Sequence, residues 1–92
     1  MQSVIQEDKK HCYMCGAVVG LEEHHIFPAS NRKKSEKMGY KVMLCHYCHN
    51  EPPFGVHHNR ENMDRLKRIA QKHYEKTGTR EEFIKDFGRN YL

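Results

Sequence analysis

Two Cys-x-x-Cys pairs occur in the chain, one at Cys12 and Cys15 and the other at Cys45 and Cys48. Thiolates spaced in this way lie close enough to share one metal ion, and four of them match the tetrahedral coordination of Zn²⁺. Disulfides or two separate redox pairs are the alternative, but no thioredoxin-like βαβ pattern accompanies the cysteines. The spacing predicts one structural zinc site with Zn–S distances of about 2.3 Å.

Histidines are concentrated between the cysteine pairs and just after them. His24 and His25 are adjacent, His49 directly follows the second pair, and His57 and His58 come soon afterwards. Imidazole suits ions such as Zn²⁺ and Ni²⁺, and a catalytic site needs about three protein ligands beside a base that does not bind the metal. We therefore expect a second divalent ion here, although each histidine taken singly also fits a surface or packing role.

The size of the chain limits its hydrophobic core. It has 92 residues, of which 37% are hydrophobic, with no tryptophan. A domain of this size usually needs a disulfide or a metal to be stable. We see no signal peptide and no apolar run of the ~20 residues that span a membrane, so we expect no membrane partner and a cytoplasmic location. A reducing compartment favours metal over disulfides.

The net charge of +4 weakly favours a polyanionic partner. Basic residues gather in the polar stretch 29–40 and at the start of a later helical pattern. We expect some of them to bind nucleic-acid phosphates without reading the sequence, the alternative being a solvated basic surface. The candidates are Arg32, Lys33, Lys34, Lys37 and Arg60.

The pattern predicts a small zinc-stabilised α+β domain over residues 11–92, preceded by a flexible lead at residues 1–10. Short strands are expected at Val18–Val19, at 21–27 and at 41–44, with 29–40 as a polar excursion. Pro52 and Pro53 stop any helix that begins near His49. One helix is predicted at 60–77, capped by Asn59 and ended by Gly78. A second helix is predicted at 80–87, where Thr79 and Glu82 form a capping box. Its inward-facing residues are expected to be Phe83, Ile84 and Phe87.

These residues resemble the HNH endonuclease family, also described as ββα-metal or treble-clef nucleases. The matching pieces are the Cys12 knuckle, the stretch Glu23-His24-His25-Ile26-x-Pro28, and the stretch from Leu44 to His49. The match covers residues 11–60, and the remainder looks like small phage and prophage HNH proteins. The resemblance implies a treble-clef-like ββα-metal core over 11–60, followed by the C-terminal helices.

By position, the resemblance implies that His25 is the general base and that His24 and His49 bind the catalytic metal. The proline pair displaces the last ligand, so His57 or His58 must serve, and we favour His57. The middle asparagine of the family braces the loop between the strands. Tyr40 and Lys41 stand at its expected place, and Asn31 is expected to take over its role.

The resemblance thus implies a metal-dependent endonuclease that hydrolyses phosphodiester bonds in DNA. Its cofactors would be a structural Zn²⁺ and a second ion such as Mg²⁺, Mn²⁺, Ni²⁺ or Zn²⁺. Two alternatives stay open: a non-catalytic zinc-binding module for nucleic acid, and a phage protein-interaction domain. Metal-dependent cleavage separates the first alternative from the nuclease, and salt-dependent DNA binding separates the second.

Overall fold

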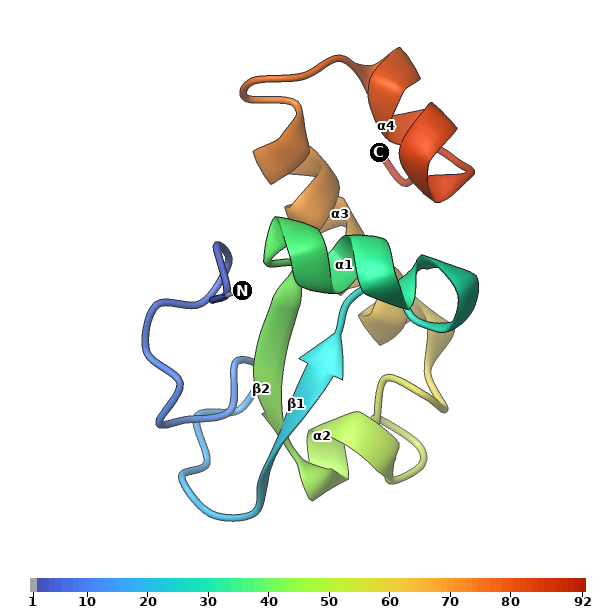
Figure 1. Cartoon of the computed structure of the whole chain (residues 1–92). Helices are drawn as coiled ribbons and strands as arrows, with labels where there is room; N and C mark the ends of the chain where they lie inside the picture. The colour runs from blue at the N-terminus through green and yellow to red at the C-terminus, as the bar shows by residue number, and fades with distance from the viewer. Residues whose placement is uncertain (1) are drawn as a thin grey trace.

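The computed structural model describes residues 2–92 and shows a small α+β fold, as predicted, built around a two-stranded sheet (Figure 1). No helix among these residues combines the length and the apolar character that crossing a membrane requires. The elements in chain order are β1 (Leu21–His25), the 3₁₀ turn η1 (Ala29–Asn31), α1 (Arg32–Met38), β2 (Lys41–Cys45), α2 (His46–Asn50), α3 (Arg60–Tyr74) and α4 (Arg80–Phe87).

The antiparallel hairpin of β1 and β2 is the centre of the fold, with His24 opposite Val42 and His25 opposite Lys41. The polar stretch 29–40 forms η1 and α1 and connects the two strands across one end of the sheet (Figure 1). Gly39 ends α1 with φ 74°, in the left-handed region, and a Cβ there would lie 2.6 Å from the Gln2 carbonyl oxygen. The chain can therefore turn directly from α1 into β2.

The strand predicted at Val18–Val19 is not formed. Both valines are exposed, with 71% and 80% of their surface accessible, and they lie in a turn between Gly16 and Gly20, which both have positive φ. Two apolar residues between such glycines are too short a run to form a strand. The strand predicted at 21–27 ends at His25, because Ile26 and Phe27 leave the sheet for the core.

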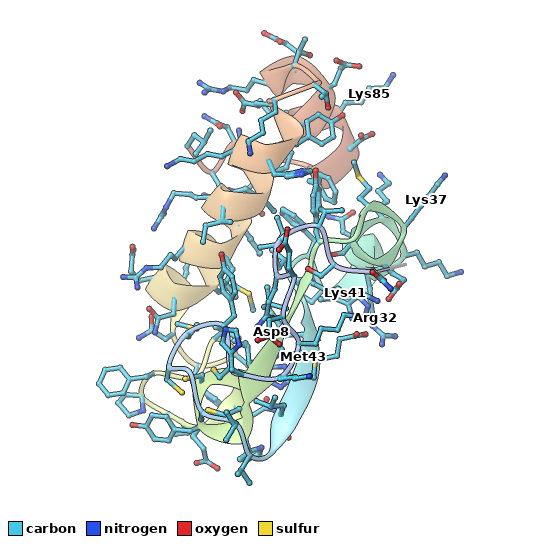
Figure 2. The ribbon with its side chains drawn as sticks, turned by 90° about the vertical axis from the view of Figure 1, so that its left-hand side faces the viewer. Asp8, Arg32, Lys37, Lys41, Met43 and Lys85 are labelled. Atoms are coloured by element: carbon cyan, nitrogen blue, oxygen red, sulfur yellow. The ribbon has the colours of Figure 1, made fainter. Side chains whose placement is uncertain are left out.

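Residues 2–10 contact the domain, although the sequence suggested a flexible lead. Ser3 donates to the Lys41 carbonyl, and the Val4 amide donates to the Gly39 carbonyl at 2.9 Å. Gln6 is 4% exposed and accepts a hydrogen bond from the Met43 amide at 2.7 Å. Figure 2 looks onto this side, where the segment covers β2 near Lys41 and Met43. The outer edge of β2 offers unpaired backbone groups, and the segment satisfies them.

An aromatic cluster joins the C-terminal helix to the hairpin. Phe27 stacks on Phe87 with ring centroids 4.2 Å apart and meets Phe83 edge-on at 5.8 Å. Tyr40 is 2% exposed and packs against the same group. Ile84, expected to face inward, is 37% exposed because it lies on the other side of α4. Burying these rings fixes the end of the hairpin from which the histidines project.

Both predicted N-caps are present. The Asn59 side chain accepts from the Asn62 amide at 2.9 Å, and Thr79 and Glu82 form the reciprocal capping box. Helix α4 covers the same residues as its prediction, whereas α3 ends at Tyr74, short of the predicted residue 77. The amide of Gly78 still bonds the Tyr74 carbonyl at 2.9 Å, so the glycine closes the turn that follows the helix.

Candidate metal centres

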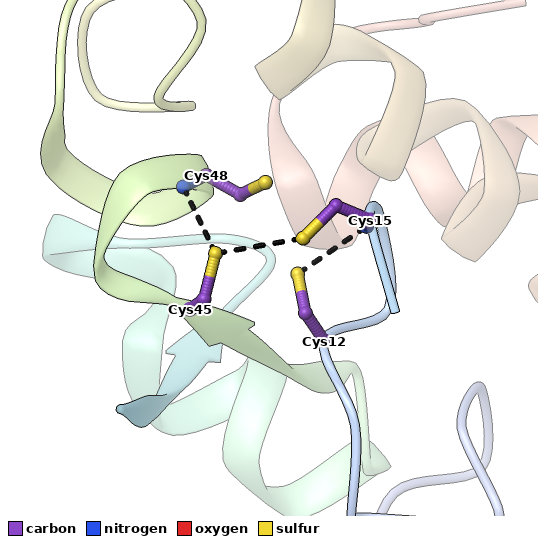
Figure 3. A group of neighbouring side chains, drawn as sticks. All are labelled: Cys12, Cys15, Cys45 and Cys48. Carbon is purple, nitrogen blue, oxygen red and sulfur yellow. Dashed lines mark hydrogen bonds between the residues drawn. The ribbon is translucent and has the colours of Figure 1, made fainter. Parts of the chain in front are cut away.

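The four cysteines lie together, with their Sγ atoms all within 4.8 Å of one another (Figure 3). The Sγ atoms of Cys15 and Cys45 are 3.6 Å apart. A tetrahedral Zn²⁺ with Zn–S bonds of about 2.3 Å separates its sulfurs by about 3.8 Å. The cluster therefore has the size and the ligands to bind a structural metal such as zinc, as the spacing predicted.

Each Cys-x-x-Cys turn directs a backbone amide at its first sulfur. The Cys15 amide lies 3.4 Å from Cys12 Sγ, and the Cys48 amide lies 3.5 Å from Cys45 Sγ, where Cys45 also caps α2. The Tyr13 amide donates to the Met43 carbonyl at 2.8 Å, which ties the first turn to β2. The two turns thus meet although 29 residues of sequence separate Cys15 from Cys45.

The electrostatics of this cluster favour a bound cation. Burial alone raises the pKa of the Cys12 thiol, but backbone N–H groups, that of Cys15 foremost, lower it to about 6. Burial and the neighbouring sulfurs of Cys15 and Cys45 raise the pKa of Cys48 above its usual range. Several thiolates cannot coexist at these distances without a compensating charge, and a divalent ion supplies that charge.

A second cluster consists of His24, His49 and His57, one nitrogen of each lying within 4.8 Å of the others. Their ring centroids are 4.8 to 5.2 Å apart, and the rings are steeply inclined to one another. His24 comes from β1, His49 from α2 and His57 from the loop before α3. Three histidines that are distant in sequence therefore converge here.

Glu22 orients His49. Its Oε1 lies 2.7 Å from His49 Nδ1, and its Oε2 lies 3.1 Å from His46 Nδ1. A carboxylate only accepts, so His49 carries its proton on Nδ1 and presents an Nε2 lone pair. That Nε2 lies 3.1 Å from His57 Nε2, a contact that is favourable only with a proton or a metal ion between the two nitrogens.

The sequence reasoning missed Glu22, although a signal for it exists. Glu22 and His24 are two apart on β1, so both side chains project from the same face of the strand. A carboxylate at that spacing from a predicted metal ligand is placed to support the next ligand. This role is common among metal-binding histidines, whose second nitrogen usually donates to a carboxylate or carbonyl.

His24 has a buried ring nitrogen that a bound cation would satisfy. It is 2% exposed, and its buried Nε2 has no hydrogen-bond partner among residues 2–92. Burial, reinforced by His49 and His57, lowers the pKa of His24 to about 3, so the ring is neutral at ordinary pH. A buried neutral imidazole nitrogen without a partner costs free energy unless it binds something. The three histidines therefore fit a divalent ion.

The loop after α2 returns His57 to His49. The Val56 amide donates to the Cys48 carbonyl at 2.8 Å, and the His57 amide donates to the His49 carbonyl at 3.2 Å. Asn59 holds the loop from the other side through the Pro53 carbonyl at 3.1 Å. The proline pair thus ends α2 and turns the chain back. His58 is exposed and does not join the cluster, whereas His57 does.

His25 points away from this cluster. Its Nε2 lies 2.9 Å from Glu36 Oε1, while Lys41 Nζ lies 2.9 Å from Glu36 and 3.5 Å from Glu23. Adjacent side chains on a strand face opposite sides, and β1 keeps that alternation up to its last residue. Glu23, His25 and Glu36 also lie within metal-binding distance of one another, but Lys41 already forms ion pairs with both carboxylates.

Asn31 does not brace the loop between the strands. It starts α1, and its side chain donates to the Phe87 carbonyl at 3.4 Å, so it links α1 to the end of α4. Ser35 forms the brace instead, since its buried Oγ accepts from the Phe27 amide at 3.2 Å and donates to the Tyr40 carbonyl. The sequence did not predict this role for Ser35, because Ser35 lies in a polar stretch whose pattern does not indicate which side chains are buried.

The predicted phosphate-binding residues are exposed but do not form one patch. Arg32, Lys33 and Lys37 line a hollow together with His25. Figure 2 shows Arg32, Lys37 and Lys41 on the same side of the molecule. Lys34 instead donates to the Asp86 carbonyl at 2.7 Å, and Arg60 lies at the start of α3, beside His57. Basic side chains therefore flank both His25 and the histidine cluster.

No protein-family model, curated protein or solved structure matches this chain. The chemistry of the site must therefore be inferred from its own geometry. Four cysteines can fill every position of a tetrahedral ion, whereas three histidines would leave one position open. The first arrangement is typical of structural metal sites and the second of catalytic ones.

Proposed function

We propose that this chain is a metal-dependent endonuclease of the HNH type, with a treble-clef-like ββα-metal core, that hydrolyses phosphodiester bonds in DNA. The observation that carries the proposal is the convergence of His24, His49 and His57, with one buried imidazole nitrogen left without a partner. His25 follows His24 directly in the chain and supplies a histidine outside that cluster. Metal-assisted hydrolysis requires a metal ion with an open position and a general base that does not bind the metal.

The two centres have separate roles in this proposal. The cysteines hold a structural Zn²⁺ and stabilise a small core. The three histidines hold a second divalent ion, which supplies Lewis-acid stabilisation of the charge that develops on phosphate oxygens. Glu22 keeps His49 in the tautomer that leaves Nε2 available, and the loop held by Asn59 keeps His57 in reach.

His25 acts as the general base. Glu36 accepts the proton on His25 Nε2 at 2.9 Å, which leaves the lone pair on Nδ1 to take a proton from the attacking water. The sheet has two strands, so the outer edge of β1 pairs with no other strand among residues 2–92. Arg32, Lys33 and Lys37 bind neighbouring phosphates next to His25.

Nicking of supercoiled plasmid tests the proposal. The purified protein is incubated with Mg²⁺, Mn²⁺, Ni²⁺ or Zn²⁺, and conversion to the open-circular form is followed over time. We expect metal-dependent nicking, and we expect His25→Ala to lower the rate by about 10²- to 10⁴-fold. His11→Ala serves as the matched control, because His11 lies outside both clusters. Nicking by a folded His25→Ala variant at the wild-type rate would show that His25 is not the base.

A non-catalytic module that binds nucleic acid is the second candidate. The observation that favours it is the hydrogen bond of His25 to Glu36, on the opposite face of β1 from the histidine cluster. Metal analysis and cleavage assays separate the two functions. One zinc per chain, lost when the cysteines are replaced, together with DNA binding and no cleavage by any of the four ions, would favour the module.

A further inference from the structure

A basic hollow beside His57 has no role in the function proposed above. It lies between the loop that carries His57, the start of α3 and the chain after α4, and its volume is about 460 Å³. Ligand pockets in proteins typically measure about 300 to 1,000 Å³. Its lining includes three cationic side chains and one acidic side chain, namely Arg60, Lys67, Arg89 and Asp64.

Two of the three cations in this hollow have no ion-pair partner among residues 2–92. Lys67 and Arg89 both lie against the Tyr91 ring, at 5.2 and 4.8 Å from its centroid, and neither forms an ion pair with a residue in 2–92. Arg60 is 3.7 Å from Asp64, but its side chain is 78% exposed. Partial burial lowers the pKa of Lys67. The nearby Asp64 carboxylate opposes this shift, and Arg89 and Arg60 add to it. Gathering like charges in this way costs free energy that a bound anion would recover.

The hollow adjoins the histidine cluster. His57 belongs to both, since its side chain lies beside His49 and also lines the hollow. Besides burial and the neighbouring histidines, the Lys67 ammonium contributes to the lowered pKa of His24, which places Lys67 within electrostatic reach of that buried ring. An anion held in the hollow therefore lies next to the proposed metal site.

We infer that Lys67 and Arg89 form a phosphate subsite, which binds the backbone phosphate of a DNA strand adjacent to the one that is hydrolysed. The inference rests on the proposed function, because it takes DNA as the ligand. It extends the path of the strand beyond His25, from the hollow of Arg32 and Lys37 across the edge of β1 to α3. Both residues contact phosphate only, so they add affinity without sequence preference.

The salt dependence of DNA binding tests the subsite separately from catalysis. Fluorescence anisotropy of a labelled 12-base-pair duplex is measured across a salt series, with His25→Ala as the background and Zn²⁺ present. We expect Lys67→Gln and Arg89→Gln each to reduce the slope of log K against log salt by about 1, and to weaken binding to all duplex sequences alike. Lys72→Gln is the control, since Lys72 is exposed on the same helix but outside the hollow. It should leave the slope unchanged.

The outcomes separate the subsite from the nuclease function. If the wild type cleaves DNA but the Lys67→Gln/Arg89→Gln double variant keeps the parental slope, the subsite is wrong and the nuclease stands. If the protein binds DNA without cleaving it and the double variant loses slope, the subsite stands and hydrolysis fails. Absence of binding by the wild type overturns both. Arg89→Gln alone decides the matter if Lys67→Gln does not fold, because Arg89 is exposed.

Discussion

His57 Nε2 lies 3.1 Å from His49 Nε2, although the two residues are eight positions apart and belong to different elements. The pair is held by backbone bonds as well as by side chains, because the His57 amide donates to the His49 carbonyl at 3.2 Å. Glu22 fixes the other side of the His49 ring. Contacts within the chain thus position these histidines, which reduces the ordering that metal binding has to impose.

Removing a cysteine should unfold the domain. Cys45 ends β2 and caps α2, and it belongs to the four-sulfur cluster, so Cys45→Ala removes a metal ligand and a cap together. Structural zinc contributes about 10 to 16 kcal/mol of apparent binding free energy in small zinc domains, more than a core of this size supplies. We expect loss of helical circular dichroism and of bound zinc.

Val19→Ala is the control for this experiment, because Val19 is near the first cysteine pair but 80% exposed. It should retain one zinc per chain and the wild-type spectrum. A folded Cys45→Ala protein that still holds zinc would rule out the structural site. Adding a chelator to the wild type should reproduce the unfolding, and adding Zn²⁺ back should reverse it.

Glu22→Gln should weaken metal binding at the histidine cluster. The amide can no longer accept a charge-assisted hydrogen bond from His49 Nδ1, whose orientation then becomes less fixed. Loss of such a supporting group typically lowers metal affinity by about 10- to 100-fold. Titration of Ni²⁺ or Zn²⁺ into protein already holding one zinc, followed by calorimetry, measures the effect.

Glu51→Gln is the matched control for Glu22→Gln. Glu51 contacts His46 at 2.9 Å, as Glu22 does at 3.1 Å, but it makes no side-chain contact with the histidine cluster. The affinity of the Glu51→Gln variant for the second ion should equal that of the wild type. Equal affinities for both variants would contradict the role given to Glu22.

Ser35→Ala should destabilise the hairpin. The substitution leaves the buried Phe27 amide without its acceptor and removes one of the hydrogen bonds to the Tyr40 carbonyl. An unsatisfied buried backbone group costs about 1 to 3 kcal/mol. Urea denaturation at a fixed zinc concentration measures the free energy of unfolding. Ser30→Ala, at an exposed position just before α1, should change it by less than about 0.5 kcal/mol.

Thr79→Ala should destabilise α4 and the aromatic cluster that α4 completes. The Thr79 side chain accepts from the Glu82 amide at 3.1 Å, and the Glu82 carboxylate accepts from the Thr79 amide at 3.0 Å. Loss of such a cap costs about 0.5 to 2 kcal/mol. Thr77→Ala is the control, since Thr77 is exposed between the helices and contributes a backbone hydrogen bond only. If both variants denature at the same urea concentration, the capping box contributes no stability.

The sequence by itself determined the features that depend on short spacing. The two Cys-x-x-Cys turns, the Asn59 cap and the Thr79 capping box all follow from residues within a few positions of one another. The α+β class and the helix starts followed for the same reason. Local hydrogen bonding and periodicity favour these structures before any distant part of the chain is in place.

The tertiary structure decided what depends on contacts between distant residues. It selected His57 over His58, added Glu22 behind His49, and gave the loop brace to Ser35 rather than Asn31. In the folded chain, the His25 side chain lies on the face of β1 opposite His24 and contacts Glu36 of α1. Spacing along the chain does not specify which side chains meet after folding. That outcome depends on how the loop after α2 returns to α2 and on how α1 packs across the end of the hairpin.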